Sequence, residues 1–433
     1  MEKQNSSSRR RFLKLAGAGS LGTMAGLSGC LGGGGDGGGG SGDGGDGGSG
    51  DGSSDGGSGD GSSGGDGGSD TDSPSSSSRG DASVREEYGL PELDYELEEE
   101  LTIFQWADYW PLSEDFNTLQ VFEDAYGVNV NVSNYASNEE MFNKLKAGGS
   151  GQFDLIFPSD YMVSILSDQG MVQPLDLDKI PNWSNLEDRW RNEAPYDPGE
   201  ERYSAPYFWG TSGIGWNENM LPEDTEYPLD SWDALWNEEY SGQITMLNDM
   251  RETLGASLKR LGYSLNSESE SEIEEAKQAL IEQKDLLLTY DSVNMAENLI
   301  NENASPIHTW SGSPFSAYWE LYEDGSSPIG YRVPEEGSVV WVDTAAITSE
   351  AQHPNAAHAF INYVLAGQVN GAIANYVYYP SPNAAAKEYI FESMLNNKRI
   401  YPPDEIMQKL EFIRNLGQAT SIWSEAWTEI QNA

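Results

Sequence analysis

Short apolar runs alternate with amphipathic stretches along the chain from about residue 101 onward. Runs rich in apolar and β-branched residues predict strands, and stretches with a helical period predict helices. The predicted strands are 101–106, 128–135 and 154–158, and the predicted helices are 116–126, 137–147 and 161–169. This βαβαβ order predicts a parallel sheet with helices on both faces, in which ligands bind at the carboxyl ends of the strands.

Four polar residues follow two of these predicted strand ends. Asp108 and Tyr109 come after the first strand, and Ser159 and Tyr161, with Asp160 between them, come after the third. Because the carboxyl ends of parallel strands meet at one edge of a sheet, these side chains are candidate ligand contacts.

A second α/β unit is predicted after the Gly-rich, apolar segment 206–216, which suits a crossing between two lobes. The folded part has roughly 340 residues, too many for one typical core and natural for two lobes. The later predicted strands are 244–248, 305–310 and 339–348, and the later helices are 249–261, 267–285, 355–366 and 403–416. Residues 376–382 are predicted to be an aromatic, Pro-rich loop.

Trp341 and Asp343 lie two positions apart in a predicted strand, so their side chains share one face. Trp106 and Asp108 repeat this pair at the end of the first strand. An aromatic ring beside a carboxylate suits a cation on an apolar chain, because the carboxylate pairs with an ammonium and the ring covers methylenes. Either pair alone also fits a packed core Trp next to an Asp that caps a turn.

Asp249 and Glu252 are spaced i and i+3 at the start of a predicted helix, so they can share a face. The same pair fits an N-cap Asp followed by an acid that the helix dipole favours.

The N-terminus has the order of an export signal. Arg9-Arg10 begin a twin-arginine pattern, a short apolar run follows, and Leu27-Ser-Gly-Cys30 is typical of a lipoprotein cleavage site. Cys30 is the only cysteine, so we expect it to carry a lipid and the mature chain to have no disulfide. Residues 31–85 are mostly Gly, Ser and Asp and are predicted to be a disordered tether.

The composition is strongly acidic, with 71 Asp and Glu against 24 Lys and Arg, for a net charge of −47. Nucleic acid is disfavoured as a partner because phosphates need a basic face. The same bias is typical of proteins of extreme halophiles, and molar salt screens charges beyond about 3 Å. Cation binding must therefore be argued from short-range, partly buried groups.

Motifs for catalysis are not apparent. The three histidines, His308, His353 and His358, stand in no nucleophile or metalloprotease motif, and no Gly-rich phosphate loop occurs outside the tether. We predict no catalytic residues, no metal and no cofactor.

From about residue 101 to residue 431 the chain resembles the spermidine/putrescine-binding proteins of bacterial ABC importers. Ten short segments carry the resemblance in order and spacing: Phe104–Tyr109, Tyr135–Met141, Asp154–Ser159, Pro206–Gly210, Ser231–Trp236, Asp249–Glu252, Leu261–Ser264, Trp310–Ser313, Trp341–Asp343 and Tyr379–Asn383. The resemblance implies a two-lobed type II periplasmic binding protein fold of the α/β class, each lobe a mostly parallel sheet flanked by helices, with the ligand cleft between them. The expected parts are a signal peptide at 1–30, the tether at 31–85, the first lobe at 98–207, the second at 208–340, and a return to the first lobe with C-terminal helices crossing between lobes at 341–433.

The resemblance also implies site roles. Trp106 and Trp341 would flank the polyamine methylenes, with Trp310 and Tyr379 completing an aromatic box. Asp249, Glu252 and Asp343 would take ammonium groups at one end and in the middle, and Asp108, with Tyr109, Ser159 and Tyr161, would serve the other end. Two departures leave the choice between spermidine, putrescine and a longer polyamine open: the family's Thr is Ala107 here, and a Gln near its C-terminus falls at Ile413.

We therefore predict a monomeric, lipid-anchored binding subunit on the outer face of the cytoplasmic membrane. It would be exported by the twin-arginine route, and its partners would be a polyamine and the permease and ATPase of an importer. The alternatives are a binding protein for another small organic cation or solute, a secreted hydrolase and a surface receptor.

Overall fold

The computed structural model describes residues 80–433, except residues 108, 136, 193, 198, 200, 227 and 228, and these described residues belong to one compact unit. The predicted signal peptide with Cys30, most of the predicted tether and Asp108 therefore lie outside the described residues. The end of the region assigned to the tether is helical, because Ala82–Glu87 form helix α2, which the Asp81 side chain caps.

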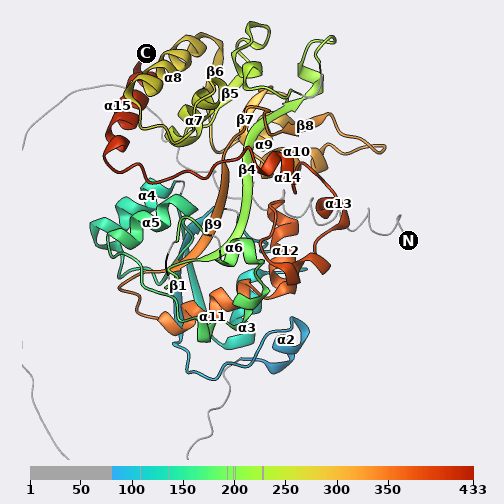
Figure 1. The fold of residues 1–433 in the computed structure, drawn as a ribbon. Helices are drawn as coiled ribbons and strands as arrows, with labels where there is room; N and C mark the ends of the chain where they lie inside the picture. Colours follow the sequence, from blue (N-terminus) through green and yellow to red (C-terminus); the bar gives the residue numbers. More distant parts are fainter. Residues whose placement is uncertain are drawn as a thin grey trace, which may run out of the picture. The chain divides into compact units, whose positions relative to one another are not determined.

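Nine strands form one mixed sheet (Figure 1), in the order β2-β1-β3-β9-β4-β7-β5-β6, with β8 paired to β4. They are β1 (Glu100–Trp106), β2 (Asn129–Tyr135), β3 (Leu155–Ile156), β4 (Ala205–Asn217), β5 (Ile244–Met246), β6 (Leu287–Tyr290), β7 (Ile307–Trp310), β8 (Ile329–Arg332) and β9 (Val340–Ile347). The pairs β1–β2, β1–β3, β5–β6 and β5–β7 are parallel, as the alternating pattern predicted. The middle of the sheet is antiparallel, which the sequence did not predict, because β4 and β9 run against each other and against their outer neighbours.

Strands β4 and β9 lie side by side and connect the two parallel parts of the sheet (Figure 1). Every residue of both strands is buried. Small residues allow this close packing: a Cβ on Gly210 would lie 2.3 Å from the Trp341 ring, and one on Gly215 would lie 2.9 Å from Pro314. The segment that the sequence assigned to a crossing between lobes is thus the long strand β4.

The helices are α2, α3 (Thr118–Tyr126), α4 (Asn138–Lys144), α5 (Asp160–Asp168), α6 (Asp188–Asn192), α7 (Met250–Arg260), α8 (Glu270–Gln283), α9 (Met295–Ile300), α10 (Gly312–Glu320), α11 (Pro354–Val364), α12 (Gly367–Val377), α13 (Glu392–Leu395), α14 (Asp404–Met407) and α15 (Thr420–Asn432). Local signals fix several of their ends. Ser137 accepts a hydrogen bond from the Glu140 backbone N–H and so begins α4, and Gly127, at φ 67°, ends α3 in the left-handed conformation.

The predicted helix at 403–416 is wrong. Only Asp404–Met407 are helical, and a turn at 408–409 and a non-helical segment to residue 416 follow them. Glu411 exchanges backbone hydrogen bonds with Ser338 and Val340 at the start of β9, so pairing beside the sheet replaces the helix there.

Separate buried clusters form the core. One contains residues of β1, α3 and α11, and another contains residues of β5, α7, α8 and α15. Within the described part of the chain, none of the helices has the length and apolarity to cross a membrane. The predicted α/β class is confirmed.

Candidate functional site

Six aromatic side chains gather in one cluster, four from β1, β2, β7 and β9, one from α5 and one that follows α12. Trp341, Tyr161 and Tyr135 are buried within it, and Trp106, Trp310 and Tyr379 pack against it. Five of these six were predicted as ligand contacts from the sequence. The cluster thus brings together rings from positions far apart in the chain.

Asp343 lies at the centre of one group of polar contacts beside this cluster. Its side chain is 6% exposed and accepts hydrogen bonds from the Tyr109 hydroxyl and, at 2.7 Å, from the Ser159 hydroxyl. The backbones of Ser159 and Asp343 also pair directly, which fixes the loop after β3 against β9. Both carboxylate oxygens are thereby oriented by two strand-end residues.

Trp341 lies on the same strand, two positions before Asp343. Its ring packs on the bare backbone of Gly210 and meets the Tyr379 ring edge to face, with 4.7 Å between ring centroids. Trp106 is held at the end of β1, where its Nε1 donates a hydrogen bond to the Phe157 carbonyl oxygen at 2.9 Å. These rings are therefore fixed in orientation by neighbouring strands.

A second group of polar contacts surrounds the start of α7. Asp249 is the N-cap residue, and its side chain accepts from the backbone N–H groups of Arg251 and Glu252 at 2.9 and 3.0 Å. Glu252 is buried, and its Oε1 accepts from Ser212 Oγ at 2.9 Å and from Trp310 Nε1 at 3.0 Å. The capping interpretation of Asp249 is correct, and it leaves Glu252 free to face the aromatic cluster through Trp310.

A third contact joins α4 and α5. The Tyr161 hydroxyl donates to Glu139 Oε1 at 2.9 Å. Desolvation by the surrounding protein and the nearby charge of Asp249 both raise the pKa of Glu139, although the residue keeps contact with solvent. This electrostatic effect indicates that the N-terminal turn of α4 and the N-cap of α7 bring two carboxylates close to each other.

Burial controls the charge of these acids. It raises the pKa of Asp343 to about 6, partly offset by the hydrogen bonds from Tyr109 and Ser159. Burial, and then the charge of Asp249, raise the pKa of Glu252 to about 8. Burial also raises the pKa of Asp249. The ionised form of each acid is therefore costly unless a cation comes close.

The grouping differs from the sequence-based expectation. Tyr109 and Ser159 were expected to serve one end of the site with Asp108, but both bind Asp343. Tyr161 binds Glu139 instead. Asp108 lies outside the described residues, so its expected role stays a prediction.

Three residues in contact with the site were not predicted: Glu139, Ser212 and His308, whose Nε2 lies 3.9 Å from Glu252 Oε2. Glu139 stands inside a capping motif, so its position had a sufficient local explanation. His308 precedes Trp310 by two positions in β7, and this spacing on a strand was the available signal that both side chains lie on one face. Ser212 carried no local signal, because its contact with Glu252 depends on the pairing of β4 with β7.

The site combines buried carboxylates, hydroxyl donors that orient them and several aromatic faces. Such a set can bind an ammonium group through a carboxylate and cover an attached alkyl chain with rings.

The profile of the family described as "Bacterial extracellular solute-binding protein" matches residues 117–397 of the chain. The spermidine/putrescine-binding periplasmic protein of Escherichia coli (strain K12) is 33% identical over 331 residues, which cover 76% of this chain and 91% of that protein. The chain is thus similar to that protein over nearly all of the latter's length.

Two solved structures are similar in fold and sequence. The spermidine/putrescine ABC transporter substrate-binding protein of Streptococcus pneumoniae is 32% identical, with a TM-score of 0.65 over 77% of this chain and 99% of that one. A lipoprotein of Treponema pallidum is 29% identical, with a TM-score of 0.65 over 76% and 99% of the two chains. The predicted two-lobed type II periplasmic binding protein fold is confirmed by this similarity.

Proposed function

Because this chain belongs to the bacterial extracellular solute-binding proteins, we propose that it captures a polyamine outside the cytoplasm and delivers it to an ABC importer. Solute-binding proteins of ABC transporters bind and are not enzymes, in line with the prediction that the chain has no catalytic activity. The observation that carries the proposal is the buried Asp343, oriented by Tyr109 and Ser159 next to the ring of Trp341.

The chemistry of a polyamine fits this observation. Spermidine and putrescine carry ammonium groups separated by short alkyl chains, and each ammonium is costly to desolvate unless a carboxylate meets it. The rings of Trp106, Trp310, Trp341 and Tyr379 would cover the methylenes. Burial has raised the pKa of Asp343, so an ammonium next to this acid would favour its ionised form.

We assign the ammonium groups to three places. Asp343 takes one group, with Tyr109 and Ser159 fixing its carboxylate. Glu252 and Asp249 take a second at the start of α7, with Tyr161 close to them through Glu139. Asp108 is assigned to a third.

The lobes would be residues 98–207 with the return from 341, and residues 208–340. The C-terminal helices would cross between them, since α15 packs against β5, α7 and α8. They would close by a hinge motion about β4 and β9, and closure would shield the acids from salt. We propose that the protein acts as a monomer with the permease and ATPase of the importer.

A calorimetric titration in molar potassium chloride tests the proposal. Spermidine and putrescine are compared with butane-1,4-diol, which has the length of putrescine without its charges. Saturable binding of a polyamine and none of the diol is expected, because the site recognises charge at short range. Absence of heat with every polyamine would refute the proposal, and other small organic cations would then be screened.

We also propose that Cys30 carries a lipid after export by the twin-arginine route. The similar protein of Treponema pallidum is described as a lipoprotein, which supports the proposal. Cys30→Ala is expected to release the protein from the membrane fraction into the medium. Retention of the Cys30→Ala protein in the membrane fraction would contradict lipid anchoring.

A further inference from the structure

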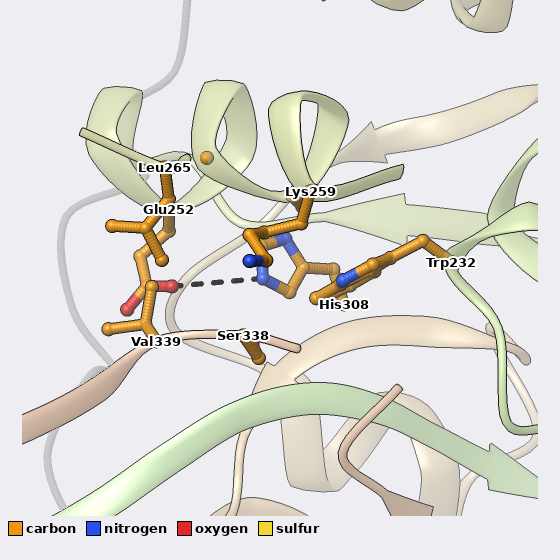
Figure 2. A pocket seen from close by; sticks show the side chains of 9 residues that line it. Trp232, Glu252, Lys259, Leu265, His308, Ser338 and Val339 are labelled. Atoms are coloured by element: carbon orange, nitrogen blue, oxygen red, sulfur yellow. Dashed lines mark ion pairs between the residues drawn. The ribbon is translucent and has the colours of Figure 1, made fainter. Parts of the chain in front are cut away.

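The two carboxylate oxygens of Glu252 have different surroundings. Oε1 accepts hydrogen bonds from Ser212 and Trp310. Oε2 is buried and has no hydrogen-bond partner among the described residues. The basic nitrogen that faces it is Nε2 of His308, at 3.9 Å (Figure 2).

His308 is itself fully buried, and neither of its ring nitrogens has a partner within the part of the chain that the structure describes. Its ring lies between Glu252 and Trp232 (Figure 2), with the Trp232 ring edge to face at 5.0 Å between centroids. Strand β7 places His308 and Trp310 two positions apart, so one strand supplies a neighbour for each oxygen of Glu252.

The space between these groups is narrow. It is lined by Glu252, His308, Lys259 and Ser338 among others, and none of the gaps between them is wide enough for a water molecule. The Ser338 hydroxyl is also buried there without a partner among the described residues. Glu252 and His308 therefore face each other directly and not through solvent.

Other charged groups around Glu252 are engaged elsewhere. On α7, the Arg251 guanidinium donates to the Arg414 carbonyl oxygen and to Asn266, and Lys259 pairs with Glu411 at 2.9 Å. Lys259 is thus paired elsewhere, whereas the Arg251 charge lowers the pKa of Glu252 without a hydrogen bond to Oε2 among the described residues.

Three further titratable groups interact with Glu252. Asp249 raises its pKa, and Asp160 on α5 and Tyr331 on β8 are close enough for charge interaction with it. The Asp160 carboxylate accepts from the backbone N–H groups of Tyr161 and Val342, and the Tyr331 hydroxyl donates to the Thr211 carbonyl oxygen. Of the unpartnered groups near Oε2 among the described residues, His308 and Ser338, His308 is the titratable one, with Nε2 at 3.9 Å.

We propose that His308 is a positioning residue that controls the protonation of Glu252 and hence the pH range in which the site takes a cation. The inference rests on the proposed function, because it concerns the same site. Neutral imidazole has one N–H and one acceptor nitrogen. It can accept from the protonated carboxyl group and, as the other tautomer, donate to the carboxylate. When an ammonium group arrives, the Glu252 proton leaves to solvent and the imidazole N–H stabilises the charge that remains.

The pKa values agree with this geometry. The pKa of Glu252 is raised to about 8, and burial lowers the pKa of His308 to about 3. Near pH 7 the empty protein therefore holds the proton on Glu252, and binding of a cation is expected to release close to one proton.

The test measures putrescine affinity and proton release between pH 6 and 9 by calorimetry in two buffers with different ionisation enthalpies. His308→Met removes both polar ring atoms, whereas His308→Gln keeps a donor and an acceptor. The matched control is His358→Gln, because His358 is a buried histidine whose Nε2 accepts from the Asp176 backbone N–H, away from Glu252.

The Met variant is expected to bind putrescine about ten-fold more weakly than wild type below pH 7 and about two-fold more weakly at pH 9. These differences correspond to a rise of about one unit in the Glu252 pKa. The Gln variant and the control should follow the wild-type pH profile. A wild-type profile for the Met variant, or a weakening that is equal at every pH, overturns the inference.

Two further outcomes are informative. If the Met variant does not fold, proton release by the wild-type protein is the deciding measurement. Binding of putrescine at pH 7 without release of a proton also overturns the inference. If wild-type protein binds no polyamine at any pH, the proposed function fails, which is a different result from binding with an unchanged pH profile.

Discussion

Replacing Asp343 with Asn removes one charge and keeps the shape of the side chain. The Asn oxygen can still accept a hydrogen bond from Tyr109 or Ser159, whose hydroxyls can rotate. Because Asp343 is 6% exposed, an ammonium placed beside Asn would remain buried without its counter-charge. Truncating one partner of a buried charge pair costs about 2–5 kcal/mol, which corresponds to about 30- to 5,000-fold weaker binding.

The same substitution is not expected to reduce the stability of the protein without ligand. Burial raises the pKa of Asp343 to about 6. Above that pH Asp343 is ionised in the folded protein, where the charge costs more free energy than it does in the unfolded chain. Removing the charge is therefore expected to leave the free energy of unfolding at pH 7.5 unchanged or to raise it, by at most about 3 kcal/mol. Lost affinity without lost stability is the expected combination.

Calorimetric titration at pH 7.5 gives the affinity, and urea denaturation gives the stability. Asp197→Asn is the matched control, because Asp197 is 4% exposed and bonded by Ser204 but lies outside the site. The control should bind polyamine normally. Near-wild-type affinity for Asp343→Asn would refute the reasoning, and so would an equal loss of affinity in the control.

Two further predictions concern the start of α7. Asp249→Asn should keep the helix cap and the unfolding midpoint, since Asn caps a helix as well as Asp does. It should lower polyamine affinity about ten-fold or more. Unchanged affinity would mean that Asp249 is only a cap. Because the pKa of Glu252 is raised to about 8, the folded protein keeps the Glu252 proton between about pH 4.5 and 8, whereas the unfolded chain loses it. The free energy of unfolding should therefore fall by up to about 5 kcal/mol as the pH rises through that window. Urea denaturation should show a flatter pH dependence for Glu252→Gln and in saturating polyamine; an equally steep dependence in Glu252→Gln would contradict this origin.

Local patterns predicted the parts of the fold that local interactions determine. The predicted end of helix 116–126 and the predicted start of helix 137–147 agree with the caps at Gly127 and Ser137, because a few neighbouring residues decide such ends. The 403–416 segment failed because Glu411 pairs with the backbone of the β9 region, and tertiary pairing overrides a helical spacing of apolar residues.

The candidate site was predictable residue by residue but not as a set of contacts. The common face of Trp341 and Asp343 follows from the period of a strand. The contact of Ser159 with Asp343 does not, because it joins residues 184 positions apart through the pairing of β3 with β9. Glu139 was hidden because its place in a capping motif already explained it.

The close packing of β4 limits how the specificity of this protein can be altered. A methyl group on Gly210 would collide with the Trp341 ring, and one on Gly215 would collide with Pro314 and Thr309. Larger side chains at these positions would therefore displace the neighbouring residues. They would alter the shape of the binding surface without adding a useful new contact to the ligand. A library designed for a new ligand, for example in a fluorescent sensor, should hold β4 constant and vary α4 and the loops after β1 and β3.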